Sequence, residues 1–114
     1  METTITGTTE LLVAAVQAEA GNQDEQGIRL VTDVILNRVA SSKFPNTVEG
    51  VVLAPGQFSV VHNGSLNKAK KNLSNDIKAI VESEVSSMDR LNTDILYFNN
   101  SDNGGWKYGG HWFK

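Results

Sequence analysis

The sequence contains no cysteine, and this absence removes several classes of protein at once. Without a thiol there is no disulfide scaffold, no cysteine nucleophile, no cysteine-ligated zinc and no iron–sulfur cluster. Positive charge is also scarce, because ten Lys and Arg residues stand against thirteen Asp and Glu, for a formal net charge of −3. A chain with this balance has no basic footprint for nucleic acid or for an anionic membrane, so we expect neither as a partner.

Long apolar runs are missing as well. A helix that spans a bilayer needs about 20 consecutive apolar residues, and the sequence has no run of that length. The first ten residues, METTITGTTE, lack both the basic start and the apolar middle of a signal peptide. We therefore expect neither a membrane segment nor an export signal in these residues.

The 114 residues that are present suit a single compact domain. We expect a polar lead-in over residues 1–9 and one folded domain over residues 10–114. Helical spacing of apolar residues predicts three principal helices, over 10–20, over 24–40 and from a cap at Ser74 onward. The third helix should bury Ile77, Ile80, Val81, Val85 and Met88.

The remaining segments are short. The sequence predicts a helical turn over 47–53, a loop over 56–72 and a small irregular β-hairpin near the C-terminus. The expected fold class is therefore mainly α, with a minor β component.

Glu19 is the most informative residue of the first helix. On a helical wheel of about 100° per residue, it shares the apolar face with Leu12, Ala15 and Val16, in the last turn before Gly21. Burial disfavours an ionised carboxylate, so the pKa of Glu19 should rise, as suits a general acid. The alternative is a glutamate at the helix edge that reaches solvent or pairs with an arginine, and position alone leaves both open.

Other polar residues are less specific. Arg38 falls within the apolar arc of the second helix, where a cation needs a partner such as an acid or terminal carbonyls. Gln57, Phe58 and Ser59 offer an amide, a ring and a hydroxyl, a set that suits sugars but is also ordinary loop chemistry.

The C-terminal third is rich in rings, which either stack on sugars or close a small core; they include Tyr97, Phe98, Trp106, Tyr108, Trp112 and Phe113. His62 and His111 are isolated, and Asp102-Asn103-Gly104 is an incomplete calcium loop. We therefore expect no metal site.

Several short segments, in order along the chain, resemble one known family. They are Ala18-Glu19-Ala20, Val34-Ile35-Leu36-Asn37-Arg38-Val39, Phe44-Pro45-Asn46-Thr47-Val48, Pro55-Gly56-Gln57-Phe58-Ser59, Gly64-Ser65-Leu66-Asn67 and Leu96-Tyr97-Phe98-x-Asn100. In this order the chain resembles the SleB/CwlJ-type cell wall hydrolases, which include spore cortex-lytic enzymes and related phage lysins. The resemblance runs from about Leu11 to Phe113, nearly the whole chain.

The resemblance implies a lysozyme-like domain that cleaves the β-1,4 bond between N-acetylmuramic acid and N-acetylglucosamine in peptidoglycan. It also implies a lytic transglycosylase, in which Glu19 alone acts as acid and then base and 1,6-anhydro ends form. By the same resemblance, substrate would contact Gln57, Phe58, Ser59, Tyr97 and His111, and Asn37 and Arg38 would support the site. This chemistry needs no cofactor, and we expect a monomer.

One position departs from the resemblance. Many relatives carry Gly-Glu soon after the catalytic segment, where this chain has Asn22-Gln23. If a second acid is needed, Asp24 or Glu25 would be the nearest replacements, and the protein would be a hydrolytic muramidase.

Two further alternatives stay open: a peptidoglycan-binding module without turnover, and a component of a phage particle. The expected site of action is the vegetative cell wall or the spore cortex. Delivery there would depend on phage-mediated release or on a longer parent protein.

Overall fold

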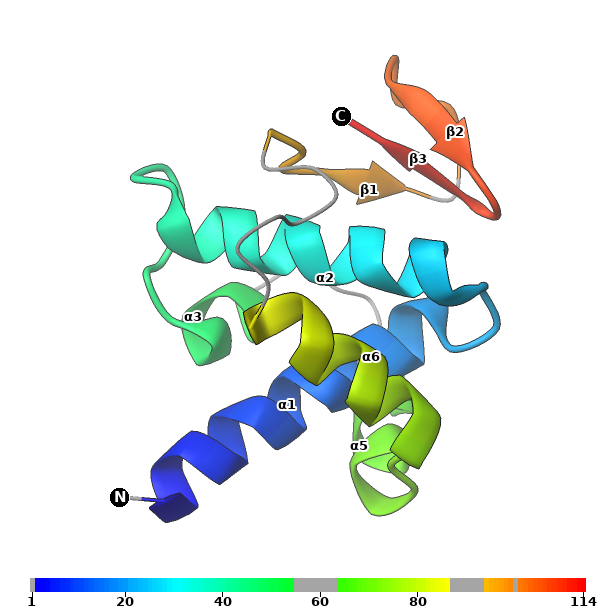
Figure 1. The fold of residues 1–114 in the computed structure, drawn as a ribbon. Coiled ribbons are helices and arrows are strands. Elements are labelled where there is room, and N and C mark those ends of the chain that lie inside the picture. Colours follow the sequence, from blue (N-terminus) through cyan, green and yellow to red (C-terminus); the bar gives the residue numbers. More distant parts are fainter. Residues whose placement is uncertain (1, 55–63, 87–93, 100) are drawn as a thin grey trace.

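The computed structural model describes residues 2–54, 64–86, 94–99 and 101–114, with side chains from residue 9 onward. Helices dominate these residues, and a small sheet covers one side of α2 (Figure 1). The helices are α1 (Glu2–Ala20), α2 (Glu25–Ala40), α3 (Val48–Val52), α5 (Ser65–Lys71) and α6 (Asn75–Ser86). The strands are β1 (Phe98–Asn99), β2 (Trp106–Tyr108) and β3 (His111–Phe113). The mainly α prediction is confirmed.

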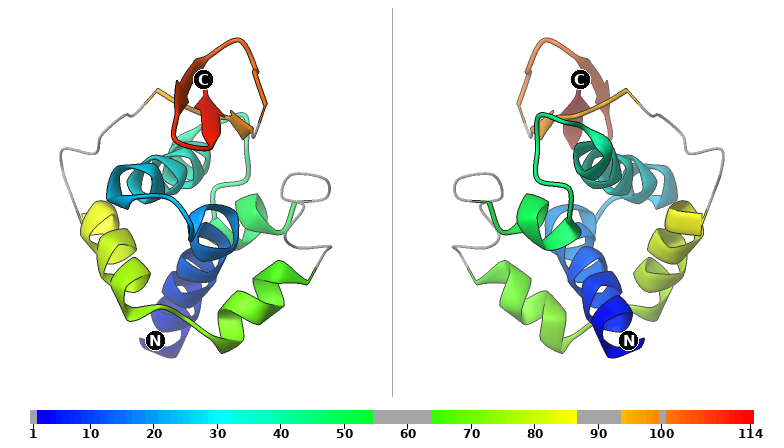
Figure 2. Two further views of the ribbon diagram at one scale, coloured as in Figure 1. Left: turned by 90° about the vertical axis from the view of Figure 1, so that its right-hand side faces the viewer. Right: turned by 90° about the vertical axis from the view of Figure 1, so that its left-hand side faces the viewer.

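Helix α1 forms the centre of the fold. It contacts α2, α3, α5 and α6, and the two views of Figure 2 show these helices gathered around it. Every residue from Leu11 to Val16 is buried, as expected for a helix that is enclosed on all sides. Glu19 thus lies at the end of the element around which the core is built.

The expected start of this helix at Glu10 is wrong, because α1 begins at Glu2. The residues before Glu10 are mostly threonine and lack an apolar period, so periodicity could not include them. Once the buried segment has nucleated a helix, each added residue contributes another backbone hydrogen bond, and the helix extends without further apolar contacts.

Capping side chains set the boundaries of α2, α3 and α6. Asp24 accepts a hydrogen bond from the Gly27 backbone at 2.9 Å, and Thr47 accepts one from Gly50 at 3.0 Å. Ser74 accepts one from the Ile77 backbone at 3.3 Å. Side-chain oxygens at these positions satisfy N–H groups that have no partner within the helix. The predicted second helix, the short turn and the Ser74 cap are confirmed.

The loop predicted over 56–72 is wrong in its second part, because residues 65–71 form α5. This helix buries only Leu66 and Ala69, too few apolar residues to give a recognisable period. Residues 55–63 lie outside the part of the chain that the structure describes.

The predicted buried face of α6 needs one correction. Ile77 and Val81 are buried and Ile80 packs partly against the core, but Val85 is 48% exposed. Glu84 occupies the buried position instead, at 2% exposure. Met88 lies outside the described residues.

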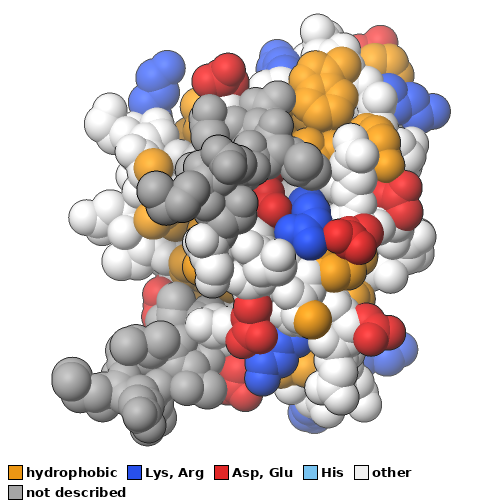
Figure 3. Space-filling view, viewed as in Figure 1, with side chains coloured by type: hydrophobic (Ala, Val, Ile, Leu, Met, Phe, Trp, Pro, Cys, Tyr) orange, Lys and Arg blue, Asp and Glu red, His pale blue; other side chains and the backbone are white. Residues whose placement is uncertain are grey.

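An ion pair explains this exchange. Arg29 on α2 lies 3.1 Å from the Glu84 carboxylate and 2.8 Å from that of Glu25. Burial of an ionised carboxylate is costly unless the group is paired. On the face shown in Figure 3, acidic and basic side chains lie next to one another in the region of α2 and α6.

The sheet has the order β1-β3-β2, and both pairings are antiparallel. The strand that the sequence did not predict is β2, which continues into β3 through Gly109 and Gly110, with Gly109 at a φ of +58°. The predicted hairpin, between the apolar run 95–98 and the aromatic run 109–113, is confirmed by the pairing of β3 with β1. This pairing joins Phe98 to Phe113, which is fully buried and carries the sheet onto the helical core.

No helix among the described residues is both long and apolar enough to cross a membrane.

Candidate active site

The Glu19 side chain lies half-buried in the last turn of α1. Burial raises the pKa of this carboxyl group. Among the described residues, none forms a hydrogen bond or an ion pair with it. Glu19 therefore has no arginine partner among the described residues, and its carboxyl group is partly desolvated and partly open to solvent. Such a group holds its proton at a higher pH than an ordinary glutamate does.

His111 on β3 lies directly against Glu19. Burial lowers the pKa of this imidazole more than the Glu19 backbone carbonyl raises it, and the Nδ1 atom is buried with no partner in the described chain. Burial of this kind favours the neutral form of the imidazole.

The neutrality of His111 predicts acid sensitivity. Because the folded state depresses the pKa, stability is fully present above the pKa of an unfolded histidine, about 6.5, and falls as the pH decreases through that value. We expect urea midpoints of the wild-type protein to decrease in this range. His111→Phe, which binds no proton at this position, should reduce this dependence. An equal pH dependence in both proteins would contradict the inferred neutral state.

Side chains between α1 and α2 hold the β2–β3 turn in place. The Gln23 side-chain oxygen accepts a hydrogen bond from the Gly110 backbone at 2.9 Å. The Tyr108 hydroxyl donates to Asp24 at 2.7 Å. A side chain at Gly109 would displace the end of the Gln23 side chain, and the φ of +58° at this position also favours glycine. Gln23 is the residue at which this chain differs from the Gly-Glu of many relatives, and in this structure it supports the hairpin.

The two candidate second acids are engaged elsewhere. Asp24 caps α2 through Gly27, and that bond, followed by the one from Tyr108, lowers its pKa. Glu25 pairs with Arg29 at 2.8 Å. The lowered pKa of Asp24 makes it a poor proton donor or acceptor near neutral pH, and Glu25 is engaged in an ion pair.

Asn37, Arg38 and Tyr97 form a separate cluster at the other end of α2. Asn37 donates to the Ile95 carbonyl at 2.8 Å, and Arg38 donates to the Leu96 carbonyl at 2.7 Å. The Arg38 guanidinium lies over the rings of Phe44, at 5.0 Å, and Tyr97, at 5.4 Å. Arg38 thus meets carbonyls, one of the partners expected for it.

The Tyr97 ring remains 43% exposed, and no hydrogen bond joins it to Glu19. The expected contacts of Gln57, Phe58 and Ser59 lie outside the described residues, as does His62. In the part of the chain that is described, no group of three His, Asp or Glu side chains is placed to hold a metal ion.

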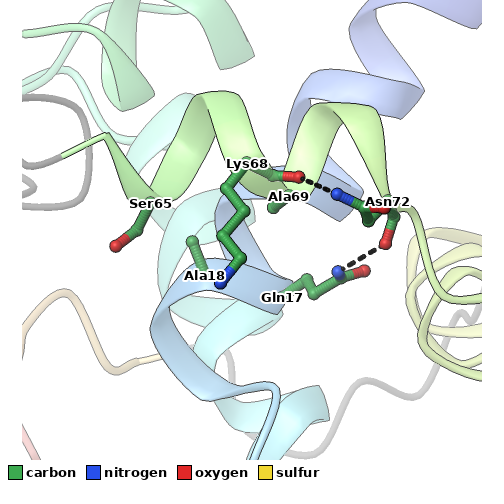
Figure 4. Close-up of a pocket in the computed structure, with 6 residues that line it drawn as sticks. All are labelled: Gln17, Ala18, Ser65, Lys68, Ala69 and Asn72. Atoms are coloured by element: carbon green, nitrogen blue, oxygen red, sulfur yellow. Dashed lines mark hydrogen bonds between the residues drawn. The ribbon is translucent and has the colours of Figure 1, made fainter.

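A pocket of about 360 Å³ lies between α1 and α5, and we refer to it as the α1–α5 pocket (Figure 4). Its lining residues are Gln17, Ala18, Ser65, Lys68, Ala69 and Asn72. Sequence reasoning missed it, because Gln17 lies away from the apolar face of α1 and α5 was expected to be a loop. Ala18, which lines the pocket, directly precedes Glu19 in the chain, and Glu19 itself is not among the lining residues.

Known proteins are similar to this chain in sequence and in fold. Residues 22–113 match the family model described as cell wall hydrolase. The spore cortex-lytic enzyme of Bacillus cereus is 33% identical over 90 residues, which cover 79% of this chain and 34% of that protein. The Bacillus subtilis spore cortex-lytic enzyme is 32% identical over 89 residues, covering 78% and 28%. The chain thus spans about a third of the length of these relatives.

Two solved structures are similar over almost their full length. The catalytic domain of the germination-specific lytic transglycosylase SleB from Bacillus anthracis aligns with a TM-score of 0.74 at 30% identity, covering 93% of this chain and 92% of that one. The catalytic domain of the Bacillus cereus SleB protein gives the same TM-score and identity, with coverage of 94% and 89%. The family match, the sequence relatives and the shared fold agree, and the chain belongs to the cell wall hydrolase family.

Proposed function

We propose that this chain cleaves the glycan strands of peptidoglycan as a lytic transglycosylase, with Glu19 as its single acid and base. The observation that carries the proposal is the Glu19 carboxyl group, half-buried at the end of the central helix with a raised pKa and no cation paired to it among the described residues. Membership of the cell wall hydrolase family and the similarity to lytic transglycosylase SleB support the same chemistry.

The reaction uses one carboxyl group twice. Protonated Glu19 gives its proton to the glycosidic oxygen as the bond to C1 of N-acetylmuramic acid breaks and positive charge develops there. The C6 hydroxyl of the same sugar then attacks C1, and the Glu19 carboxylate accepts the hydroxyl proton. The products are an N-acetylglucosamine end with a free hydroxyl and a 1,6-anhydromuramic end, and Glu19 regains its proton.

The surroundings of Glu19 suit this sequence of steps. A hydrolytic muramidase needs a second group to activate water, and the nearest acids in the chain, Asp24 and Glu25, are held by Tyr108, Gly27 and Arg29. Attack by the substrate's own hydroxyl requires no such group. The expected hydrolytic alternative is therefore the less favoured one.

We assign His111 a positioning role within this proposal. Its side chain is only 7% exposed, so little of the ring is available to a sugar. A neutral imidazole beside the Glu19 backbone adds no positive charge that would lower the pKa of the acid.

Cleavage is tested by incubating the protein with purified peptidoglycan sacculi. We expect soluble glycan fragments to appear together with a loss of turbidity. Binding to sacculi without release of fragments would make the protein a binding module and would contradict the proposal.

The pH dependence of cleavage follows from the state of the acid. Because the pKa of Glu19 is raised, the protonated form persists to higher pH, and activity should fall as the pH rises through that pKa. We expect the alkaline limb of kcat/KM to lie above the ordinary glutamate value of about 4.3. A limb at or below that value would contradict the role of Glu19 as the acid. The profile is measured on soluble glycan strands at constant ionic strength.

A further inference from the structure

The α1–α5 pocket contains one positive charge that the described fold does not use. Figure 4 shows the Lys68 side chain extending from α5 toward Ala18 and Gln17 on α1. Both ion pairs found among the described residues involve Arg29, and Lys68 takes part in neither. Its ammonium group is therefore available to a ligand that enters the pocket.

The amide side chains around Lys68 are already occupied. The Gln17 amide donates to the Asn72 carbonyl at 2.9 Å, and its oxygen accepts from the Ser74 backbone at 2.8 Å. The Asn72 amide donates to the Lys68 carbonyl at 3.0 Å. These bonds hold the end of α5 against α1 and fix the wall from which Lys68 projects.

The local charge is opposite in sign to that of the chain. Helix α5, with the sequence SLNKAKK, carries Lys68, Lys70 and Lys71 and no acid, whereas the whole chain has a net charge of −3. A cluster of one sign raises the local concentration of ligands of the other sign. The pocket therefore favours an anion.

The position of the pocket identifies which anion of the substrate can reach it. Ala18 and Glu19 are adjacent, with Cα atoms about 3.8 Å apart. A strand cleaved at C1 of N-acetylmuramic acid brings the lactyl group of that sugar, and the stem peptide attached to it, close to Glu19. The methyl groups of Ala18 and Ala69 add apolar surface that suits lactyl and alanyl methyl groups.

We propose that the α1–α5 pocket binds a carboxylate of the stem peptide on N-acetylmuramic acid, with Lys68 as its counter-charge. The proposal rests on the proposed glycan cleavage, because that reaction brings the peptide-bearing sugar to Glu19. The pocket would make the protein selective for strands that carry anionic peptides.

Kinetics on two forms of the substrate test the proposal. One is native sacculi, and the other is sacculi whose carboxyl groups have been converted chemically to neutral amides. Lys68→Met should raise KM on native sacculi by about threefold to fivefold, the upper part of the range for one solvent-exposed ion pair, and leave KM on amidated sacculi unchanged. Lys70→Met is the matched control, since it removes the same charge from α5 outside the pocket. Equal effects of the two substitutions, or an equal effect on both substrates, would overturn the proposal.

A binding measurement separates this proposal from the cleavage reaction. Muramyl dipeptide, which carries a lactyl group and peptide, should shift the backbone NMR resonances of residues 64–72 in the wild-type protein, and Lys68→Met should weaken that binding by about threefold or more. Equal binding by both proteins would overturn the proposed role of the pocket, even if the protein cleaves sacculi. Conversely, binding that depends on Lys68 in a protein that releases no fragments would support the pocket and contradict the proposed function.

Discussion

Glu19→Gln is expected to lower the rate of glycan cleavage by about a hundredfold to ten-thousandfold, the usual contribution of a general acid and base. The substitution preserves the size and most of the shape of the side chain, but an amide can neither donate the proton to the glycosidic oxygen nor accept one from the C6 hydroxyl. Fragment release from purified sacculi measures the effect. Binding to sacculi should persist.

The same substitution should stabilise the folded protein near neutral pH. A raised pKa means that the folded state disfavours the ionised Glu19, so the wild-type protein loses stability as the pH rises through the range in which this group ionises. Gln carries no charge there, and the variant should have the higher urea midpoint at pH 7, with a smaller difference in acid. Higher stability with lost activity is a combination that a purely structural role for Glu19 does not produce.

Glu10→Gln supplies the matched control. Glu10 lies on the same helix, and its side chain is exposed. The control should leave cleavage unchanged. Comparable losses in the two variants, or full activity in Glu19→Gln, would contradict the assignment of Glu19.

Phe113→Ala should have the largest effect on stability, a loss of about 3–5 kcal/mol in the free energy of unfolding. The Phe113 ring is fully buried and lies near Trp106, at 5.3 Å between ring centroids, and near Phe98, at 6.4 Å. Small domains have only about 5–15 kcal/mol in total, so the variant should be close to unfolding at 37 °C.

Trp112→Ala is the control for this prediction. Trp112 neighbours Phe113 on β3 but is only half-buried, so its loss should be clearly smaller. Urea titrations followed by circular dichroism compare the two. A loss below about 1 kcal/mol in Phe113→Ala would show that the sheet does not depend on this contact.

Local signals in the sequence predicted much of the fold. Asp24, Thr47 and Ser74 are capping residues whose side chains act on the next few positions, so their role can be inferred from neighbouring residues alone. The runs that pair as β1 and β3 are likewise visible as short apolar and aromatic segments of the sequence. By contrast, α5 has only two buried apolar residues, and β2 is three residues long, so neither has a pattern of its own.

The buried Glu84 shows a second limit of prediction from sequence. A charged residue is expected on the exposed face of a helix, and its burial on α6 depends on Arg29, which lies 55 residues earlier in the chain. Only the folded arrangement brings the two together.

The candidate site also contains some residues that local patterns predict and others whose contacts depend on the fold. Glu19 was predicted because its place on the apolar face depends on residues within one or two turns of the same helix. Gln23 and Gly110 are 87 residues apart, and Tyr108 and Asp24 are 84 apart, so their contacts depend on how the sheet docks onto α1 and α2. For the same reason the contact between His111 and the Glu19 carbonyl, and the α1–α5 pocket, could not be derived from spacing.

Cleavage of purified sacculi in isotopically labelled water is the most direct test of single-carboxyl catalysis by Glu19. Mass spectrometry of the released fragments distinguishes the two reactions, because hydrolysis adds an oxygen atom from water at C1 of N-acetylmuramic acid and transglycosylation does not. We predict 1,6-anhydromuramic ends without label, formed by the wild-type protein and not by Glu19→Gln. Reducing ends that carry the label would contradict this mechanism and would identify the protein as a hydrolytic muramidase.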